Sequence, residues 1–261
     1  MALQQCCTTF EAQRYIMQHK GKITDTETPD RKSALEKVLS EEMAEIWNIL
    51  EPDQKLRVLE NFEVHNFKRN QIIYGEGDRP EYLWCLIQGK VKKYKDGVGG
   101  RVQILRLIRP VQYFGFRAFF AGEHYVSTSS AIEPSVVGSL PLKLVNELIQ
   151  SNNKLAMFFI HDLSRNLGHS DSRIVSLTQK HIRGRLAEAL IVLLENYGYE
   201  DDGMTLHIYM AREDLANLSN MTTSNAIRTL SCFVNEHIIV VDGRRIKILN
   251  ESALRKISKF G

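Results

Sequence analysis

The chain has 261 residues, of which 43% are hydrophobic and 25% are charged. This length predicts one large or two moderate domains, and the composition is that of a globular protein with an apolar core rather than a disordered or fibrous chain. A net charge of +3 is only a weak indication of a nucleic-acid partner. The sequence has no apolar run of about 18 residues, and residues 1–10 lack the features of a signal peptide, so we expect a cytoplasmic protein with no membrane partner.

The four cysteines do not form a metal-binding pattern. Cys6 and Cys7 are adjacent, and Cys85 and Cys232 each lack a second cysteine at the spacing of known zinc sites. We therefore predict reduced thiols, no metal site and no bound cofactor. The sequence also lacks the spacing of a P-loop and any recognisable pairing of a nucleophile with a base, which argues against an enzyme.

The beginning of the chain is polar and mixed. Segments 20–22 and 28–32 contain glycine, proline and charged residues that argue against a long helix, so we interpret residues 1–33 as an N-terminal extension. Apolar residues recur at helical spacing from Ala34 onward, and Glu51-Pro52-Asp53 marks the start of another helix.

Short strands follow the first helices. The apolar segments 71–74, 82–87, 91–94 and 102–105 are separated by glycine-containing turns. Strands of about four to six residues at roughly ten-residue spacing are typical of an all-β barrel or sandwich.

A long helix is expected after this β region. Ile160, Leu167 and Ile174 recur every seven residues, and Leu163 and Leu177 are interleaved with them. This is the pattern of apolar a and d positions in a two-stranded coiled coil, so these five residues are the predicted dimer interface. The alternative is a helix that packs on its own β domain, which needs a broader apolar stripe.

Segment 211–230 contains two short helices with a break at Ser219-Asn220 and a capping residue, Thr222, before the second helix. The apolar segments 238–241 and 244–249 flank Asp242-Gly243, which predicts a β-hairpin. Two helices and a hairpin in this order are typical of a winged helix-turn-helix, whose second helix lies in the DNA major groove. A helical hairpin within some other domain has the same apolar spacing.

The outward face of the second helix and the hairpin tip carry the predicted DNA contacts. Small polar side chains allow close approach, and arginine bonds guanine or phosphate. The predicted DNA-binding residues are Thr222, Thr223, Ser224, Ile227, Arg228, Arg244 and Arg245. Residues 182–261 contain ten Lys and Arg and ten Asp and Glu, so a DNA footprint depends on how the charges are arranged. An effector-binding or protein-interaction module that has lost DNA binding is the alternative.

Five motifs together resemble the Crp/Fnr superfamily of bacterial transcription regulators. They are G-E-G-D at 75–78, L-I-Q-G-K-V at 86–91, Y-F-G at 113–115, I-R-G-R-L-A at 182–187, and the helix-turn-helix. The resemblance covers about residues 36–250. It implies a homodimer that binds a two-fold symmetric site on double-stranded DNA under the control of a small effector, with RNA polymerase as a partner if the protein is an activator.

The resemblance also implies an α+β fold with three parts after the extension. An N-terminal double-stranded β-helix of the jelly-roll-like, cyclic-nucleotide-binding type forms a sensor domain at 34–151. A dimerisation helix and hinge occupy 152–181, with the hinge near 179–182, and a winged helix-turn-helix occupies 182–261. The effector signal is expected to pass from the β domain through the long helix.

The sensor departs from relatives that bind cyclic nucleotides. Their cassette has a glutamate for the ribose and an arginine for the cyclic phosphate, where this chain has Phe116 and Tyr125 or Val126. Arg117 is expected to point away from the pocket in an extended segment. We therefore predict that cyclic AMP and cyclic GMP are not effectors, and that the pocket is apolar or filled by aromatic side chains. The protein either responds to another small effector or is constitutively active.

The candidate effector-pocket residues are Gly115, Phe116, Arg117, Phe119, Tyr125, Ser127, Ser170 and Asp171. Ser170 is otherwise a weak position in the dimer seam. His161, His169 and His181 keep a haem- or redox-responsive regulator as an alternative, although His161 and His169 are two helical turns apart and cannot share one metal.

The second helix also departs from the family. Relatives that read the best-known operator have arginine and glutamate at its first two exposed positions, where this chain has Thr223 and Ser224. Only the later arginine is kept, as Arg228, so the operator sequence is expected to differ.

Overall fold

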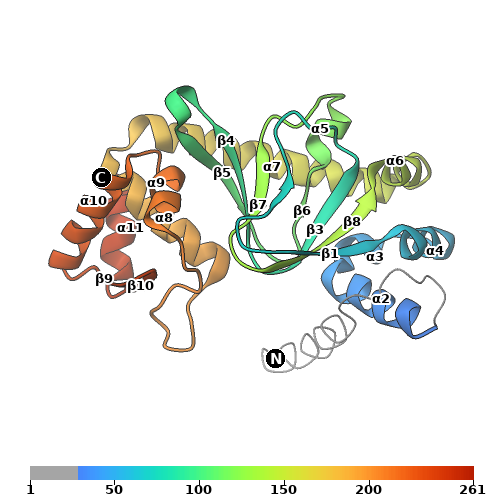
Figure 1. Cartoon of the computed structure of the whole chain (residues 1–261), viewed down its shortest axis with the longest axis horizontal. Coiled ribbons are helices and arrows are strands. Elements are labelled where there is room, and N and C mark those ends of the chain that lie inside the picture. The colour runs from blue at the N-terminus through green and yellow to red at the C-terminus, as the bar shows by residue number, and fades with distance from the viewer. Residues whose placement is uncertain (1–28) are drawn as a thin grey trace.

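The computed structural model describes residues 29–261, which form an N-terminal helical segment, a β-roll, a long helix and a C-terminal helical domain with a small hairpin (Figure 1). Residues 1–28 of the predicted extension lie outside the described residues. Helix α2 (Pro29–Glu42) begins at Pro29, earlier than the helical spacing that the sequence shows from Ala34 onward. Proline suits the first turn of a helix, where no backbone N–H is required.

Helices α3 (Ala44–Trp47) and α4 (Pro52–Asn61) complete the N-terminal segment. The side chain of Gln54 accepts from the Glu51 backbone N–H at 3.1 Å, half of a capping box that starts α4 at the predicted place. Leu39, Trp47 and Val58 are buried in one core with residues of the β-roll. The segment therefore covers one end of the β-roll.

The β-roll consists of two four-stranded antiparallel sheets. Strand order is β1-β8-β3-β6 in one sheet and β2-β7-β4-β5 in the other. The strands are β1 (Glu63–Phe67), β2 (Ile72–Tyr74), β3 (Tyr82–Gln88), β4 (Val91–Asp96), β5 (Val102–Ile108), β6 (Tyr113–Phe114), β7 (Thr128–Ala131) and β8 (Ser135–Pro141), with a short 3-10 helix, η1, at Val98–Gly100. The four strands expected from glycine-bounded apolar segments are confirmed.

Gly89 shows why the turn between β3 and β4 requires glycine. Its φ of +94° is in the left-handed region, and an added Cβ would lie 2.3 Å from Ser135 Oγ. Leu86, Val91 and Ile108 then meet between the sheets in a second buried core. The glycine of the L-I-Q-G-K-V motif thus allows two core strands to follow one another closely.

Three helices follow or interrupt the roll: α5 (Phe116–Phe120), α6 (Leu142–Ser151) and α7 (Asn153–Gln179). Asn152 caps α7, because its side-chain oxygen accepts from the backbone N–H groups of Lys154 and Leu155 at 3.1 Å each. Figure 1 shows α7 running from the β-roll to the C-terminal domain. It ends at Gln179, and α8 begins at Ile182, so the two helices break at the predicted hinge.

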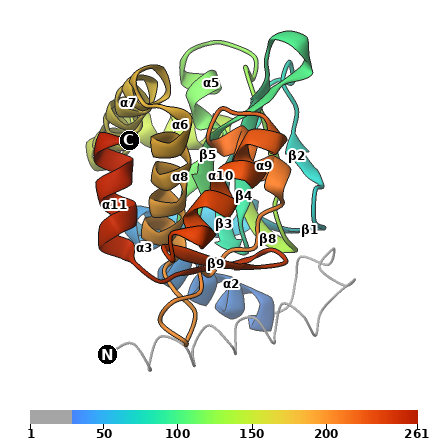
Figure 2. The ribbon, with the colours of Figure 1, turned by 90° about the vertical axis from the view of Figure 1, so that its left-hand side faces the viewer.

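The C-terminal domain contains α8 (Ile182–Tyr197), α9 (Arg212–Leu218), α10 (Thr223–Asn235), the hairpin β9 (Ile239–Asp242) and β10 (Arg245–Ile248), and α11 (Glu251–Phe260). Leu190, Leu215 and Phe233 are buried in its core. Figure 2 shows α11 beside α8. Helix α11 was not predicted, although Asn250 as its cap and the apolar Leu254 and Ile257 on one face indicate a helix.

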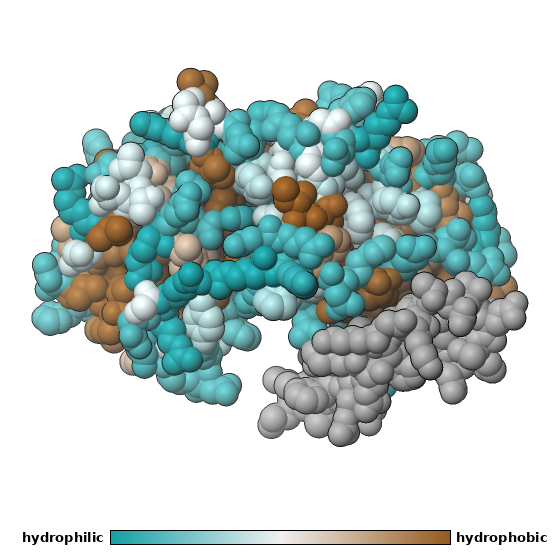
Figure 3. Space-filling view, in the orientation of Figure 1, coloured by the Kyte–Doolittle hydropathy of each residue, from teal (hydrophilic) through white to brown (hydrophobic). Residues whose placement is uncertain are grey.

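The described surface is mainly hydrophilic in the view of Figure 3, with hydrophobic residues in separate patches. Within residues 29–261, no helix has the length and apolar character needed to cross a membrane. One row of exposed apolar residues lies on α7.

Candidate nucleic-acid interface and sensor interior

The connection between α9 and α10 is a tight turn. The Ser219 hydroxyl donates to the Leu215 carbonyl at 2.7 Å, and Asn220 has a φ of +51°, a left-handed conformation that asparagine tolerates. Thr222 Oγ1 accepts from the Asn225 backbone N–H at 3.3 Å and caps α10. Ala211 stands at the N-cap of α9 without a side-chain hydrogen bond. The predicted helix-turn-helix, with one firm cap and one missing cap, is confirmed.

One face of α10 is buried and the other is free. Ala226, Leu230 and Phe233 are buried in the domain core. The candidate residues Thr222, Thr223, Ser224, Ile227 and Arg228 are exposed. The Arg228 guanidinium donates to Asn225 Oδ1 at 3.0 Å, which orients the arginine along the exposed face without burying it. This face therefore presents small polar groups around one cation.

The hairpin turns at Gly243-Arg244, because Asp242 and Arg245 are paired across the strands. Arg244 is therefore in the turn itself, whereas the sequence placed it just past the tip. Gly243 has a φ of +54°, which a turn of this length requires at one position. The Arg245 guanidinium lies over the Tyr209 ring, with 5.5 Å from its carbon to the ring centroid. Both arginines remain exposed beside α10.

Arg212, at the start of α9, is a further residue of this interface that was not expected from the sequence. Its guanidinium donates to the Gly243 carbonyl in the hairpin turn. This bond ties the first helix of the helix-turn-helix to the wing, and no periodicity in the sequence signals it. Arg212 is only partly exposed, so its first role is to position the wing.

The sensor strands contact the C-terminal domain directly. Lys92 on β4 forms an ion pair with Asp214 on α9 at 2.6 Å, and both side chains are largely buried. The Gln103 amide donates to the Asn217 carbonyl at 2.8 Å. Ile104 and Leu107 of β5 belong to the core cluster of the C-terminal domain. The β-roll and the C-terminal domain are therefore connected in two ways, through α7 and through these direct contacts.

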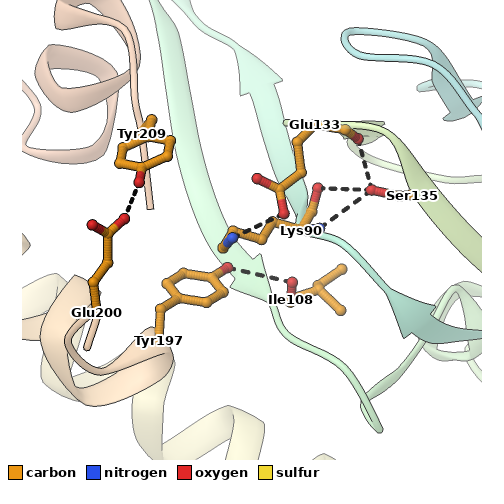
Figure 4. A network of polar contacts seen from close by, with 7 residues as sticks. All are labelled: Lys90, Ile108, Glu133, Ser135, Tyr197, Glu200 and Tyr209. Atoms are coloured by element: carbon orange, nitrogen blue, oxygen red, sulfur yellow. Dashed lines mark hydrogen bonds and ion pairs between the residues drawn. The ribbon is translucent and has the colours of Figure 1, made fainter. Parts of the chain in front are cut away.

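Figure 4 shows the polar part of this boundary. The Tyr197 hydroxyl of α8 donates to the Ile108 carbonyl of β5 at 3.4 Å. Lys90 forms an ion pair with Glu133 at 2.8 Å and lies over the Tyr197 ring, 5.5 Å from its centroid. Burial raises the pKa of Tyr197, so the hydroxyl stays a donor at neutral pH. Glu200 and Tyr209, also in Figure 4, bond each other within the C-terminal domain.

Aromatic side chains fill the positions of the two missing cassette groups. Phe116 is buried against Phe159 of α7, with 5.1 Å between ring centroids. Tyr125 is buried in the other core and stacks on Tyr74 at 3.8 Å. Phe119 packs beside Phe116, and Ser127 is buried. Phe116 and Tyr125 thus belong to two different cores rather than to one common wall.

Arg117 does not lie in an extended segment, and that part of the expectation was wrong. The segment from Phe116 to Phe120 is a short helix that starts after Gly115, whose φ is +88°. Arg117 is on its exposed side and forms an ion pair with Glu123 at 3.0 Å. Side chains alternate between two faces along a strand but not along a helix, so strand alternation does not determine where Arg117 points.

The long helix presents an uncovered apolar row. Ile160, Leu167 and Ile174 are 51%, 64% and 60% exposed. Leu163 and Leu177 are partly buried, and Leu163 packs against the sensor core. The residues at the a positions are therefore exposed, whereas Leu163 and Leu177 at d positions are partly buried.

The other candidates on α7 are solvent-facing. Ser170 and Asp171 are exposed, and the Ser170 hydroxyl donates to the Asn166 carbonyl at 2.9 Å. His161 and His169 are also exposed, and so is His181, which is the N-cap residue of α8 and not part of α7. Within residues 29–261, no three His, Cys, Asp or Glu residues gather as metal ligands, and Cys85 and Cys232 are free thiols. Cys6 and Cys7 lie outside the described residues.

A β-roll joined by a long helix to a winged helix-turn-helix is the architecture of a DNA-binding transcription regulator. Residues 64–152 match the model of the cyclic nucleotide-binding domain, and residues 184–257 match the Crp-like helix-turn-helix domain. The chain belongs to the Crp/Fnr family of transcription regulators. The predicted fold class and the resemblance are confirmed.

Individual relatives are distant but cover most of the chain. The global nitrogen regulator of Synechococcus elongatus is 23% identical over 74% of this chain and 88% of its own length. The fumarate and nitrate reduction regulatory protein of Vibrio cholerae is 25% identical over 73% and 76%. Among solved structures, the FixK2 protein of Bradyrhizobium japonicum has a TM-score of 0.68 at 22% identity, covering 75% of this chain and 96% of that one. These identities support the fold and the class rather than an effector.

Proposed function

We propose that the protein is a homodimeric regulator that binds a two-fold symmetric DNA site with the exposed face of α10. The observation that carries this is the division of α10 into a buried apolar face and an exposed face of small polar groups around Arg228. In such a domain the second helix enters the major groove and the first crosses the backbone.

The roles of the exposed groups follow from their chemistry. Arg228 reads a guanine edge, and Ile227 contacts a thymine methyl group. Thr222, Thr223 and Ser224 are short enough for the helix N-terminus to approach the backbone, where its free N–H groups bind phosphate. Arg244 and Arg245 hold the phosphates beside the wing and fix the register without reading sequence.

The second copy packs along α7. The row of Ile160, Leu167 and Ile174 is the uncovered part of a heptad pattern, and a second α7 buries it. The partly buried Leu163 and Leu177 border that seam. A dimer of this kind places the two α10 helices in successive major grooves, about 34 Å apart.

The effector, where one is used, is not cyclic AMP or cyclic GMP. In relatives that bind cyclic nucleotides an arginine of the cassette holds the cyclic phosphate, and here the cassette position holds the buried Tyr125 instead, so the nucleotide cannot be held in that way. The protein is controlled by another small effector or binds DNA constitutively. RNA polymerase is its further partner if it activates transcription.

The test is selection of bound fragments from a genomic DNA library with the purified full chain. We expect an inverted repeat with half-sites about 10 base pairs apart. Affinity for the selected site should fall by about 10³-fold or more between roughly 50 and 200 mM salt, because phosphate contacts release counterions. Recovery of no enriched sequence, with binding that is insensitive to salt, would favour a protein-interaction module instead.

A further inference from the structure

One row of side chains crosses the sheet β2-β7-β4-β5. Tyr74 on β2 is paired with Ser129 on β7, Ser129 with Lys93 on β4, and Lys93 with Arg106 on β5. Directly opposed residues in antiparallel strands point to the same face of the sheet, with Cβ atoms about 5 Å apart. Two hydroxyls and two cations therefore stand side by side (Figure 1 labels β4, β5 and β7).

This row faces the interior of the β-roll. Val91 and Ile108 are also paired across β4 and β5, two residues along from Lys93 and Arg106. Both are fully buried in the core between the sheets, where Tyr74 also packs. Alternate residues of a strand share a face, so Lys93 and Arg106 point to the same side as this core.

Within residues 29–261, Lys93 and Arg106 have no anionic partner. Their neighbours on β4 are paired, Lys92 with Asp214 and Lys95 with Glu76. Among residues 29–261, neither Lys93 nor Arg106 makes an ion pair or a side-chain hydrogen bond of ordinary geometry, although both are half-buried. Like charges directly opposite each other across two strands are destabilising, and no anion compensates the repulsion between these two cations within the described residues.

Burial and neighbouring cations further disfavour the charged forms of Lys93 and Arg106. Burial, followed by the charges of Arg117 and Arg106, lowers the pKa of Lys93 to about 8, so it is still protonated in most molecules near pH 7. Burial also lowers the pKa of Arg106, and the carboxylate that opposes this shift is Asp162 on α7. Asp162 does not form an ion pair with Arg106 within the described chain.

The hydroxyls complete the set of donors. Ser129 Oγ is fully buried and, among the described residues, makes a polar contact with the Tyr74 hydroxyl but no hydrogen bond of ordinary geometry. Burial raises the pKa of Tyr74 to about 12, so its hydroxyl keeps its proton. A buried, unsatisfied hydroxyl is costly unless something bonds to it.

We propose that this row binds the anionic oxygens of a small molecule, a carboxylate or a phosphate group, with Lys93 and Arg106 supplying the charge and Ser129 and Tyr74 supplying hydrogen bonds. The proposal rests on the proposed function, since it names the chemical class of the effector of the sensor domain. It also changes the expected character of the site. The charged end of the effector is held by the β2-β7-β4-β5 sheet instead of by the aromatic cassette.

The test is thermal unfolding of the full chain in sodium phosphate and in sodium succinate, each compared with sodium chloride at equal ionic strength. The variants are Lys93→Gln and Arg106→Gln. Lys95→Gln is the matched control, since it removes the same charge from the same strand at an exposed ion pair. Succinate and phosphate distinguish a carboxylate site from a phosphate site.

We expect at least one anion to raise the Tm of the wild type and of Lys95→Gln by about 5 °C or more at a hundredfold excess over Kd. Lys93→Gln and Arg106→Gln should lose at least about tenfold in affinity, since a charge-assisted bond is removed. In chloride alone both variants should unfold no earlier than the wild type, because a repulsion is relieved.

A wild-type shift no larger in phosphate and succinate than in chloride overturns the proposal, and so does an equal shift in Lys93→Gln. DNA binding measured on the same preparations keeps the two proposals separate. Loss of DNA binding with a retained anion shift contradicts the proposed function alone, and normal DNA binding without an anion shift contradicts the anion site alone.

Discussion

Arg228 is the only basic residue of α10, and its side chain is exposed beside the helix N-terminus. A single long donor among short hydroxyls makes sequence recognition depend on one residue. Arg244, in the wing turn, carries the same charge, and our proposal has it meet the backbone of DNA. The two arginines therefore differ in what their loss removes, although each contributes one positive charge.

Replacing Arg228 by alanine should weaken binding to the selected site by about 1–3 kcal/mol and relax base preference at one position per half-site. Arg244→Ala should weaken all DNA alike and reduce the salt slope by about one. Arg255→Ala is the control, because this arginine on α11 is already paired with Glu195 of α8 and with Glu251 of its own helix. Competition binding against point-substituted sites measures the difference. If Arg228→Ala leaves base preference unchanged, α10 does not read DNA through this residue.

Two glycines with opposite surroundings make a matched pair for stability. An added Cβ at Gly138 would lie 2.1 Å from the Phe62 ring, whereas one at Gly168 on α7 meets no atom within 4 Å. Gly138→Ala should lower the free energy of unfolding by about 1–3 kcal/mol through overpacking. Gly168→Ala should raise it by about 0.5–1 kcal/mol through helix propensity. Urea unfolding of both variants checks the signs, and equal effects would show that Phe62 moves aside freely.

At the scale of elements, the helices and strands with strong periodicity were predictable and the short or strained ones were not. The α9-α10 turn was expected from Ser219-Asn220 and Thr222, because caps and left-handed residues are local features. By contrast, the segment that forms α5 was expected to be extended, because a helix of five residues is too short to show a repeating apolar pattern in the sequence. The early start of α2 at Pro29 was missed because proline was interpreted as a break.

The helix caps give a pair of predictions of opposite sign. Thr222→Ala removes the bond to the Asn225 N–H and should cost about 1 kcal/mol of stability. Ala211→Ser offers a new acceptor to the first turn of α9 and should add a similar amount. The free energy of unfolding from urea titrations decides both. A loss of stability in Ala211→Ser would mean that the backbone at this cap does not let the hydroxyl reach the free N–H groups.

The apolar row on α7 gives a prediction about assembly. Leu167→Glu places a charge in the proposed seam, while Ser172→Glu adds the same charge at an exposed position outside it. We expect the wild type and Ser172→Glu to sediment as dimers at a concentration where Leu167→Glu is a monomer. A Leu167→Glu dimer as tight as that of Ser172→Glu would place the interface elsewhere.

At the scale of the whole molecule, the contact between β4 or β5 and α9 is the feature that sequence could not reveal. Lys92 and Asp214 are far apart in the chain, and each looks like an ordinary surface charge in its own element. Their pairing depends on how the two domains sit together, which no local period encodes. The same holds for the row from Tyr74 to Arg106, because strand register decides which residues meet.

Breaking the domain contact should loosen both partners. Asp214→Asn leaves the largely buried Lys92 without its counter-ion, so β5 and α9 should exchange amide hydrogens about tenfold faster or more. Glu213→Gln, at the exposed neighbouring position, is the control. Hydrogen exchange followed by mass spectrometry measures the rates by segment. Unchanged exchange in Asp214→Asn would show that Gln103, Tyr197 and the apolar contacts hold the domains without the ion pair.

The most direct measurement of the central claim is the mass of the complex between the full chain and one selected DNA site, determined at several salt concentrations. We predict two chains on each inverted repeat, with an affinity that falls steeply as salt rises and one half-site read by each α10. A single chain per site, or a complex that forms equally well on unrelated DNA and is insensitive to salt, would contradict a dimeric regulator that reads DNA through α10.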